Sequence, residues 1–519
     1  MEVDNMCPLL DIPLEVLLQI SSYLTTSEYG NLRRVCRQLE VSLLQSFTHE
    51  FFTKRQFMIS EFSLGALLDI SKSRFAPSLT HLIISLERPP ALPSLPIHMQ
   101  IFSDAEQAVS YNKIREEYMS HQALITTGRD LELLSEALCN LPNLKTIGLR
   151  DFNSSGRYRD GGDNTWHAYG APTFLRETNQ PLDQPRFARH LESSLVESRI
   201  QYVSHIFMTM LRSLGKVKET HVRTQSETDG PTRFEVILRS CHLPSLAFNL
   251  PHYLESTIVP FLNDLKTLFL DLGPGSFSTL VISKGGGYEG YLGLPLVTFL
   301  SKTPSLEHLR LNFRNCAMDE TKHLFQWLTR PPTTPGSLDP STPTISQGVN
   351  GNSMQGNLPR IPQTPAFQHL KELELGMLTI EPSHLLNIYK RFKSSLRIIS
   401  LHKVIFSSQS QTTATDKINL WASFFGQMAK LKFDLSAIRL SFLKQLHSMS
   451  TYSVEFKGKD QPPNTPSYTT EWTGNDFERA SGELIESINI DWPLDQDMQE
   501  DSDTSEPEGT YLYWTNIVI

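Results

Sequence analysis

The sequence has few cysteines, and none of them are paired by spacing. Its five cysteines are scattered over 519 residues, and no two form a C-x-x-C motif. This distribution argues against a disulfide framework or a structural zinc site, and it fits a reducing compartment. We therefore expect no bound metal and an intracellular location, in the cytoplasm, the nucleus or both.

Segments that would send the chain into or across a membrane are also missing. The stretch MEVDNMCPLL is acidic where a secretory signal is basic, and no apolar run of the length needed to span a bilayer follows it. The sequence therefore predicts a protein that is neither secreted nor bound to a membrane.

The sequence also has no excess of basic residues. The chain has 47 Lys and Arg against 56 Asp and Glu, for a net charge of −9. A nucleic-acid-binding protein usually shows a basic excess, so we expect no nucleic-acid partner. The length suggests roughly three units of about 150 residues, unless a repeat extends one of them.

Residues 1–50 carry the strongest local pattern. Asp11 can cap a helix that has Pro13 in its first turn, and Ser27 can cap a second helix. A third helical pattern runs through residues 41–47. Such a short module has more apolar residues than it can bury alone. Periodicity leaves two interpretations open: a helical hairpin packed on the rest of the chain, or a module covered by a partner.

A resemblance favours the second interpretation. Residues 12–24, IPLEVLLQISSYL, resemble the opening of an F-box, and residues 32–39, LRRVCRQL, resemble its second half. The chain departs from the usual pattern at Ile12, where Leu is common, and at Leu39, where an aromatic residue is common. The resemblance implies a three-helix F-box that binds the Skp-type adaptor of SCF (Skp–cullin–F-box) ubiquitin ligases. The residues that it implies for this contact are Pro13, Leu14, Leu17, Leu18, Ile20, Leu24, Leu32, Val35, Cys36 and Arg37.

The rest of the chain contains an internal repeat. An L-x-x-L-x-L pattern, or a close variant, recurs, and several copies follow a helical pattern and a tight turn. One such unit cannot bury its apolar face, whereas stacked units share a continuous core. The copies begin at Leu79, Leu144, Leu243, Leu265, Leu306, Leu370, Leu396 and Leu435.

These copies resemble the leucine-rich repeat family. None has the Asn or Cys that usually follows the strand in that family, so the resemblance implies an irregular curved solenoid. The alternative is a set of chance Leu-rich strands in an ordinary α/β domain. The predicted fold class is α/β, an N-terminal F-box followed by an irregular leucine-rich-repeat-like solenoid with disordered insertions and an acidic C-terminal segment.

This fold class divides the chain into four regions. We expect the F-box at residues 1–50, a helical linker at 51–75, the substrate-recognition domain at 76–450 and a largely flexible acidic region at 451–519. Low-complexity composition predicts insertions near residues 152–190 and 331–366.

Motifs of catalysis are sparse. Gly285, Gly287 and Gly290 satisfy G-x-G-x-x-G, but the following segment starts with Gly and Pro rather than with a clean helix, which argues against dinucleotide binding. No G-x-S-x-G elbow, Walker loop or H-E-x-x-H motif is present. We therefore expect no catalytic residue and no cofactor.

Together these patterns predict a non-catalytic substrate-recognition subunit of an SCF-type ligase. Its expected partners are a Skp-type adaptor, a cullin–RING ligase joined through that adaptor, and a protein substrate held on the repeats. Two alternatives stay open: an F-box/Skp complex with a non-degradative role, and an enzyme with a cryptic site in the 200–300 region.

The substrate is expected on the strand-lined face of the repeats. Side chains alternate along a strand, so we expect the positions between the leucines to point to solvent along one face. Aromatic and Arg side chains at such positions suit a protein partner. The residues expected to recognise the substrate are Phe269, Arg310, Glu374, Arg397 and Arg439.

Overall fold

The computed structural model describes the greater part of the chain. The described residues are 8–91, 105–156, 158–161, 165–184, 193–224, 230–277, 293–330, 362–408, 417–448, 450–457, 467–474 and 477–492. The glycine motif at 285–290, most of the predicted insertion at 331–366 and the acidic stretch from residue 493 onward lie outside them.

Three helices form an N-terminal helical module: α1 (Leu14–Ser22), α2 (Thr26–Arg34) and α3 (Arg37–Phe52). A reciprocal capping box begins α2, in which the Thr25 side chain accepts from the Glu28 N–H and the Glu28 carboxylate accepts from the Thr25 N–H. The sequence had suggested Ser27 as this cap, and the cap lies two residues earlier. The module has its own small core, formed by Leu17, Tyr29, Leu39, Leu43 and Phe51.

The remainder is built on a ten-stranded sheet that follows the sequence order. Neighbouring strands are parallel, except that β14 runs antiparallel to β11. Each strand lies beside the strand of the preceding unit, as expected when similar units stack. The strands are β1 (Lys54–Met58), β2 (His81–Ser85), β3 (Thr146–Arg150), β4 (Arg233–Ile237), β5 (Thr267–Leu272), β6 (His308–Phe313), β7 (Glu372–Gly376), β9 (Ile398–His402), β11 (Ala437–Ser441) and β14 (Thr469–Thr473).

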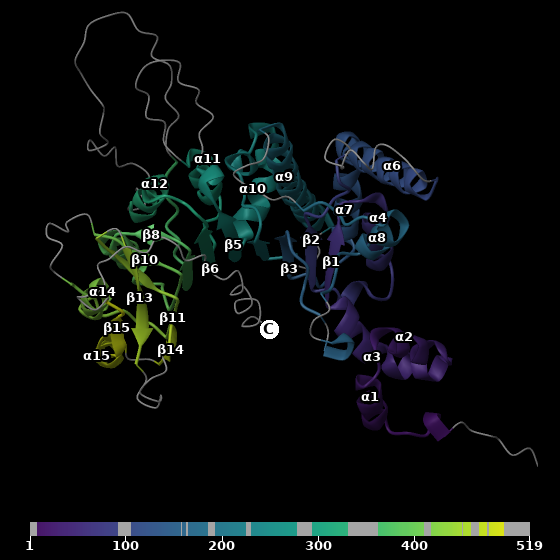
Figure 1. Cartoon of the computed structure of the whole chain (residues 1–519), viewed down its shortest axis with the longest axis horizontal. Coiled ribbons are helices and arrows are strands. Elements are labelled where there is room, and N and C mark those ends of the chain that lie inside the picture. Colours follow the sequence, from purple (N-terminus) through teal and green to yellow (C-terminus); the bar gives the residue numbers. More distant parts are fainter. Residues whose placement is uncertain are drawn as a thin grey trace, which may run out of the picture.

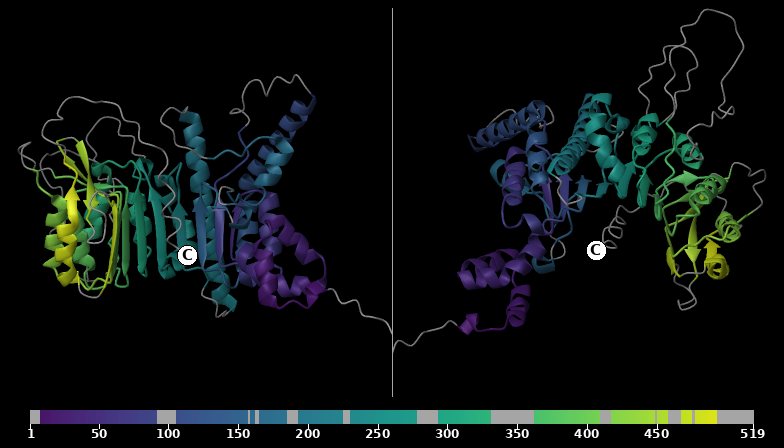
Figure 2. Two further views of the ribbon diagram at one scale, coloured as in Figure 1. Left: turned by 60° about the horizontal axis from the view of Figure 1, so that its bottom comes forward. Right: turned by 180° about the vertical axis from the view of Figure 1, so that it is seen from behind.

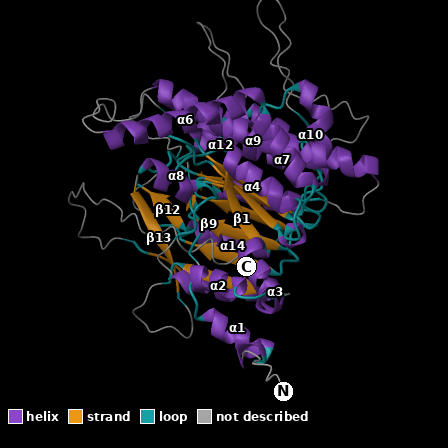
Figure 3. Cartoon of the chain, turned by 90° about the vertical axis from the view of Figure 1, so that its right-hand side faces the viewer, coloured by secondary structure: helices purple, strands orange, loops and turns teal. Residues whose placement is uncertain are grey.

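Helices precede most of these strands and cover one face of the sheet (Figure 1, Figure 3). The strands lie along the inner side of an arc, and helices such as α9, α10 and α12 lie along its outer side (Figure 1). The helices are α4 (Glu61–Ser71), α6 (Ala105–Thr127), α7 (Arg129–Cys139), α8 (Ala171–Thr178), α9 (Ser193–Thr224), α10 (His252–Asp264), α11 (Leu294–Leu300), α12 (Met318–Thr329), α13 (Pro382–Phe392), α14 (Leu420–Ala429) and α15 (Phe477–Ser487).

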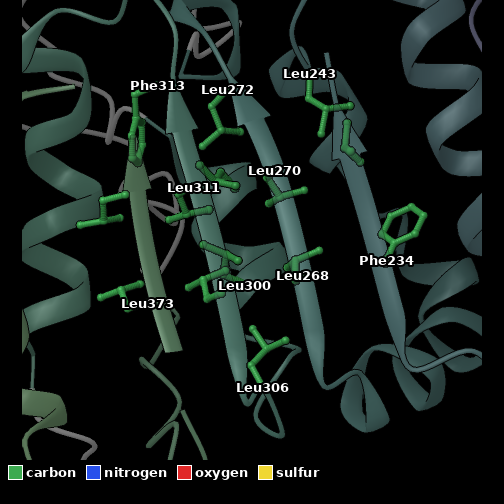
Figure 4. Close-up of a cluster of buried hydrophobic side chains, with 14 of the residues drawn as sticks. Phe234, Leu243, Leu268, Leu270, Leu272, Leu300, Leu306, Leu311, Phe313 and Leu373 are labelled. Atoms are coloured by element: carbon green, nitrogen blue, oxygen red, sulfur yellow. The ribbon is translucent and has the colours of Figure 1, made fainter. Parts of the chain in front are cut away.

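Leucines of the strands form a continuous core with these helices. In β5, Leu268, Leu270 and Leu272 point to the helical side, and Leu311 and Phe313 of β6 lie beside them (Figure 4). Alternate residues of the same strands point to the opposite, strand-lined face, because successive side chains of a strand alternate. The sequence prediction of strands at seven of the eight repeat copies is confirmed.

The copy that begins at Leu243 is not a strand. Leu243 makes only an isolated bridge to Leu272, and residues Ser245–Phe248 form a 3-10 helix. Pro244 explains the difference, since it cannot donate to a ladder and proline is rare inside sheets. The strand of this unit is β4, which carries Phe234 and Val236 where the other copies carry Leu or Ile.

A second, five-stranded sheet lies beside the C-terminal units. Its parallel strands β8 (Thr379–Ile380), β10 (Ile405–Phe406) and β12 (Lys444–His447) each follow a strand of the main sheet. Met377, Lys403 and Phe442 make the intervening turns, each with a positive φ near 50°. The same turn therefore recurs in three successive units. The antiparallel strands β13 (Ser450–Phe456) and β15 (Ile488–Ile490) complete this sheet.

Three boundaries differ from the sequence prediction. The expected helical linker at 51–75 contains β1 as well as α4. The expected insertion at 152–190 contains α8, whose Phe174 packs against Ile114 of α6. At the end of the expected insertion at 331–366, Thr364 is buried and donates to the Trp327 carbonyl at 2.8 Å. Local composition hides these elements, because each is stabilised by contacts with distant segments.

The C-terminal region also contains more structure than predicted. Strands β13, β14 and β15 and helix α15 lie within residues 451–519 or begin just before them. Trp472 and Phe477 join this region to the main core. Figure 2 shows the N-terminal helical module at one end of the row of strands and these elements at the other. Among the described residues, no helix is both long and apolar enough to cross a membrane.

Candidate functional site

The strand-lined face contains a cavity of about 460 Å³. We call it the strand-lined cavity. It is lined by residues that alternate with the core leucines along β1 to β9 and by the turns that follow these strands. The lining includes Lys54, His81, Arg150, Arg233, Glu235, Arg239, Phe269, Asp271, Arg310, Asn312, Arg314, Glu374, Ser400, His402 and Lys403.

The register of the sheet aligns several of the expected recognition residues. Glu235, Phe269, Arg310, Glu374, Ser400 and Arg439 pair in one continuous row across six strands. The sequence therefore identified a true row of side chains on one face. Arg397 does not belong to it: it precedes β9, and its side chain pairs with Asp434 at 3.3 Å.

The prediction that this row is open to solvent is wrong for its central members. Phe269 is buried, with the guanidinium carbons of Arg233 and Arg310 at 4.7 and 5.2 Å from its ring centre. Glu374 is buried and lies 2.7 Å from His308 Nε2. Long side chains from neighbouring strands cover one another across the face, which an isolated strand pattern does not reveal.

Two buried carboxylates hold the turn after β4 against this cavity. Asp151 accepts from the backbone N–H groups of Arg239, Ser240 and Cys241 at 2.7, 2.6 and 3.0 Å. Asp271 accepts from the Leu238 N–H at 2.8 Å. Burial raises the pKa of Asp271, although the Arg310 charge and the hydrogen bonds from the Leu238 N–H and the Asn312 side chain lower it in part. The turn, and the Arg239 side chain that it carries, are therefore fixed by its backbone.

Three groups on the strand-lined face, of which Glu374 lines the cavity, have the spacing of metal ligands. His308, Glu372 and Glu374 offer ligand atoms within 4.8 Å of one another. Each already has a polar partner, because His308 bridges the two carboxylates and Arg439 Nη1 lies 2.9 Å from Glu372. An ion-pair network accounts for the cluster without a metal.

Among the described cysteines, Cys241 alone lines the cavity. Burial raises the pKa of its thiol well above the usual value, and the Asp151 charge raises it further. The thiolate is the reactive form of cysteine, so this residue is a packing group at neutral pH.

The N-terminal helical module presents a different kind of surface. Val16 and Ile20 of α1 and Tyr23 at its C-cap recur at helical spacing and are exposed, Tyr23 to 81%. We call these three residues the α1 stripe. Val35 and Val41, at the α2–α3 junction and in α3, are also exposed, Val35 to 69%. An exposed group of large apolar side chains is typical of a protein-binding surface.

The residues that the resemblance implied fall into three groups on this module. Pro13, Leu14, Ile20, Val35 and Arg37 are exposed. Leu17 is buried in the module's core, so it supports the fold rather than an open surface. The residues that are partly buried against that core are Leu18, Leu24, Leu32 and Cys36. Val16, Tyr23 and Val41 were not among the expected contact residues, although their helical spacing was visible in the sequence.

The comparisons with known proteins bear on this module alone. Residues 9–44 match the family model described as F-box-like. The chain carries an F-box-like domain. No curated protein matches the chain. F-box domains typically belong to adaptors that have no catalytic activity of their own, and they are a general docking module for Skp-type adaptors.

A segment more than 100 residues away fastens the F-box-like domain to the sheet. Arg159 makes a bidentate pair with Glu50 of α3, at 2.5 and 2.6 Å, and donates to the carbonyls of Ser21 and Leu24 at 2.7 and 2.8 Å. Those carbonyls end α1, where a cation is favoured by the helix dipole. Arg159 is therefore a cap for α1 that comes from outside the domain.

The next residue, Asp160, caps the start of α2. The Asp160 carboxylate accepts from the Thr26 N–H at 2.9 Å and from the Thr26 hydroxyl at 2.5 Å, at the first turn of α2. A carboxylate is favoured at this end of a helix. We call Arg159 and Asp160 the clasp. Sequence reasoning missed it, because its two residues lie in a stretch whose composition resembles a solvated loop.

Two further contacts join the F-box-like domain to the main sheet. The rings of Phe52 and Phe75 stack with centres 4.3 Å apart. Glu40 of α3 pairs with Arg33 of α2 and with Arg74, beyond α4. Together with the clasp, these contacts fix the orientation of the domain relative to the strand-lined cavity.

Proposed function

We propose that this protein is a substrate-recognition subunit of an SCF-type ubiquitin ligase. The observation that carries the proposal is the F-box-like match over residues 9–44 on a module with exposed apolar side chains. The Skp-type adaptor would cover the α1 stripe together with Leu14, Val35 and Val41. Removing apolar side chains from water provides the driving force for such docking, at about 25 cal/mol per Å².

We also propose that the main sheet is a divergent leucine-rich repeat array. Strands in sequence order, preceding helices and the recurring turn at Met377, Lys403 and Phe442 support this assignment. The substrate would bind on the strand-lined face, where the cavity lies. Contacts between the F-box-like domain and the sheet would keep the substrate at a set position relative to the ligase.

Adaptor docking is tested by placing a charge on the proposed contact surface. Val35→Asp should reduce capture of a purified Skp-type adaptor by about a hundredfold or more, since an unpaired buried carboxylate costs several kcal/mol. Val35 is exposed in the free chain, so the variant should stay folded. The readout is affinity by surface plasmon resonance, followed by co-purification of a cullin from cells.

The matched control is Val109→Asp. Val109 lies on α6 and is exposed to 69%, the same fraction as Val35. It should leave adaptor affinity unchanged. Equal adaptor affinity for wild type and Val35→Asp would remove the assignment of this surface, and absence of adaptor binding by the wild type would remove the proposed function.

A further inference from the structure

The strand-lined cavity carries positive charge in a chain that is negative overall. Seven Lys and Arg side chains line it against three carboxylates, whereas the whole chain has a net charge of −9. A concave site lined by one sign of charge concentrates groups of the opposite sign. The cavity therefore suits an acidic occupant.

Four of these cations lie at one edge of the main sheet. Arg150 ends β3, Arg239 lies two residues after β4, and Arg314 and Lys403 directly follow β6 and β9. These strands are parallel, so their carboxyl ends meet at the same edge of the sheet. We call these four residues the basic row.

Two members of the basic row lie against the same ring. The guanidinium carbons of Arg150 and Arg239 lie 5.4 and 3.8 Å from the ring centre of Phe152. Burial lowers the pKa of Arg150, and although the Glu235 charge opposes this effect, the charges of Arg239 and Arg310 lower it further. The cations of this edge therefore disfavour one another, and an anion between them would relieve the repulsion.

Arg150 is a buried cation with incomplete pairing. It is only 6% exposed, and its Nε has no hydrogen-bond partner within the described residues. Its ion pair in that part of the chain is with Glu235 Oε2 at 3.9 Å, and Glu235 lies closer to Arg233, at 2.6 Å. A buried guanidinium without full pairing is costly, and a further carboxylate in the cavity would reduce that cost.

The sequence that follows the described part of the chain is acidic. Residues 493–508 contain seven Asp and Glu, and residues 493–519 contain no Lys, Arg or His. We call residues 493–508 the acidic segment. Like charges in such a block repel one another, so contact with cations is favoured. The acidic residues of the segment are Asp495, Asp497, Glu500, Asp501, Asp503, Glu506 and Glu508.

The acidic segment begins within reach of the basic row. The described part of the chain ends at Trp492, two residues after β15, and β13 and β12 separate β15 from β10 in the second sheet. Lys403 lies in the turn from β9 into β10. Neighbouring strands lie about 4.8 Å apart, so these three strand spacings are about 14 Å, which about five extended residues span.

The length of the acidic segment also matches the basic row. Five strand spacings separate β9, which Lys403 follows, from β3, which Arg150 ends. They amount to about 24 Å, which about seven extended residues span. Asp497 is the fifth residue after Trp492, and Asp503 lies six residues beyond Asp497. The carboxylates from Asp497 to Asp503 can therefore lie along the whole row.

We propose that the acidic segment binds the basic row of its own chain and covers the strand-lined cavity. Guanidinium groups bind carboxylates through paired N–H donors, and Lys adds a point charge. A segment of the same chain acts at a high effective concentration, so modest affinity is sufficient. The inference rests on the proposed function in one respect: the bound segment would exclude a protein substrate from the proposed face until it is displaced.

Binding of the isolated acidic segment to a chain that ends after residue 492 tests this proposal. The shorter chain keeps every described residue. It is titrated calorimetrically with a synthetic peptide of residues 493–508 at constant ionic strength, beside a neutral peptide in which Asn and Gln replace the seven acidic residues. The acidic peptide should bind at least tenfold more tightly than the neutral one. It should bind the full chain about tenfold more weakly than the shorter chain, because the full chain's own segment occupies the row.

Variants of the shorter chain test where the acidic peptide binds. Arg239→Gln and Arg314→Gln, made singly, should each weaken its binding by about tenfold, because a charge-assisted hydrogen bond is lost. Arg239→Lys, which keeps the charge, should recover part of the loss, and circular dichroism checks that each variant is folded. The controls are Lys390→Gln on α13 and Arg176→Gln on α8, both exposed residues that do not line the cavity. They should bind the peptide as the unsubstituted chain does.

Four results would overturn the proposal: no binding of the acidic peptide, equal binding of the neutral peptide, equal binding by the full and the shorter chain, or row variants that bind like the controls. Dimers of the full chain in sedimentation, absent for the shorter chain, would also overturn it and would place the segment on a second copy. None of these titrations contains the adaptor. Failure of adaptor binding would therefore leave their result intact and would count against the proposed function alone.

Discussion

The Arg159 side chain contacts all three helices of the F-box-like domain, although it lies more than 100 residues away in the sequence. Its guanidinium meets a carboxylate of α3, two carbonyls at the end of α1 and the ring face of Tyr29, at 4.6 Å. The leucines of the F-box-like domain were recognisable from their spacing, because helical periodicity is a local property. Arg159 was not, since its partners are separated from it by more than 100 residues.

Removal of the Arg159 charge should loosen the F-box-like domain. We expect Arg159→Met to cost about 2 kcal/mol of the free energy that holds α1 and α2 in place, as expected for hydrogen bonds to a charged group. Amide hydrogen exchange in α1 and α2 should then accelerate about thirtyfold. Arg176→Met, at a site exposed to 75%, is the matched control. Unchanged exchange in Arg159→Met would show that the clasp contributes little.

His81 gives a prediction about pH. Burial lowers its pKa in the folded state, so the unfolded chain binds a proton below the ordinary value of 6.5 while the folded chain does not. The contribution of His81 to the free energy of unfolding is therefore fully present above pH 6.5, and it is lost as the pH falls below that value. Between pH 7 and pH 5, His81→Gln should lose about 2 kcal/mol less stability than the wild type. Urea unfolding at both pH values measures this, and an equal loss would contradict it.

At the scale of elements, the sequence was informative where leucine marks the strand. Seven strands follow from the repeat pattern, because Leu side chains fill the shared core at every second position. The charged strand β1 and the Phe- and Val-bearing β4 do not match that pattern, and both were missed. The recurring left-handed turn was also invisible, since its three residues, Met377, Lys403 and Phe442, are not turn-forming types.

Strand β14 covers the last edge of the main sheet. It pairs antiparallel with β11, and Trp472 and Phe477 attach it to α15 and the core. A chain that ends after residue 466 should expose the β11 edge and aggregate, because an unpaired strand edge is a template for further pairing. A chain that ends after residue 492 keeps β14 and α15 and is the control. Light scattering during storage measures the difference, and equal scattering by the two chains would contradict it.

The described part of the chain contains two main hydrophobic cores of unequal size. The core of the F-box-like domain has five buried apolar residues, whereas the main core runs through nearly every unit from Phe57 to Ile490. The general architecture, a helical F-box-like domain before a mixed α/β region, followed from the sequence, because each part has its own local pattern. The cavity did not, since its charge balance depends on which strands are neighbours.

Because the two cores differ in size, we expect the two parts of the chain to differ in how well each folds without the other. A chain that begins at residue 53 should unfold cooperatively with nearly the same melting temperature as the full chain, because it keeps the main core. Residues 8–52 alone should be marginally stable, since so short a module buries too little apolar surface. Thermal melts followed by circular dichroism test both fragments. An unfolded 53–519 chain would show that the F-box-like domain is part of one folding unit.

The clasp also sets an order of events during synthesis. The F-box-like domain is complete when Phe52 has left the ribosome, but Arg159 and Asp160 follow later by about 5 to 20 seconds at ordinary elongation rates. During that interval the α1 stripe exists while the fastening of α1 and α2 does not. A nascent chain therefore displays the proposed docking surface before the orientation of the F-box-like domain is fixed.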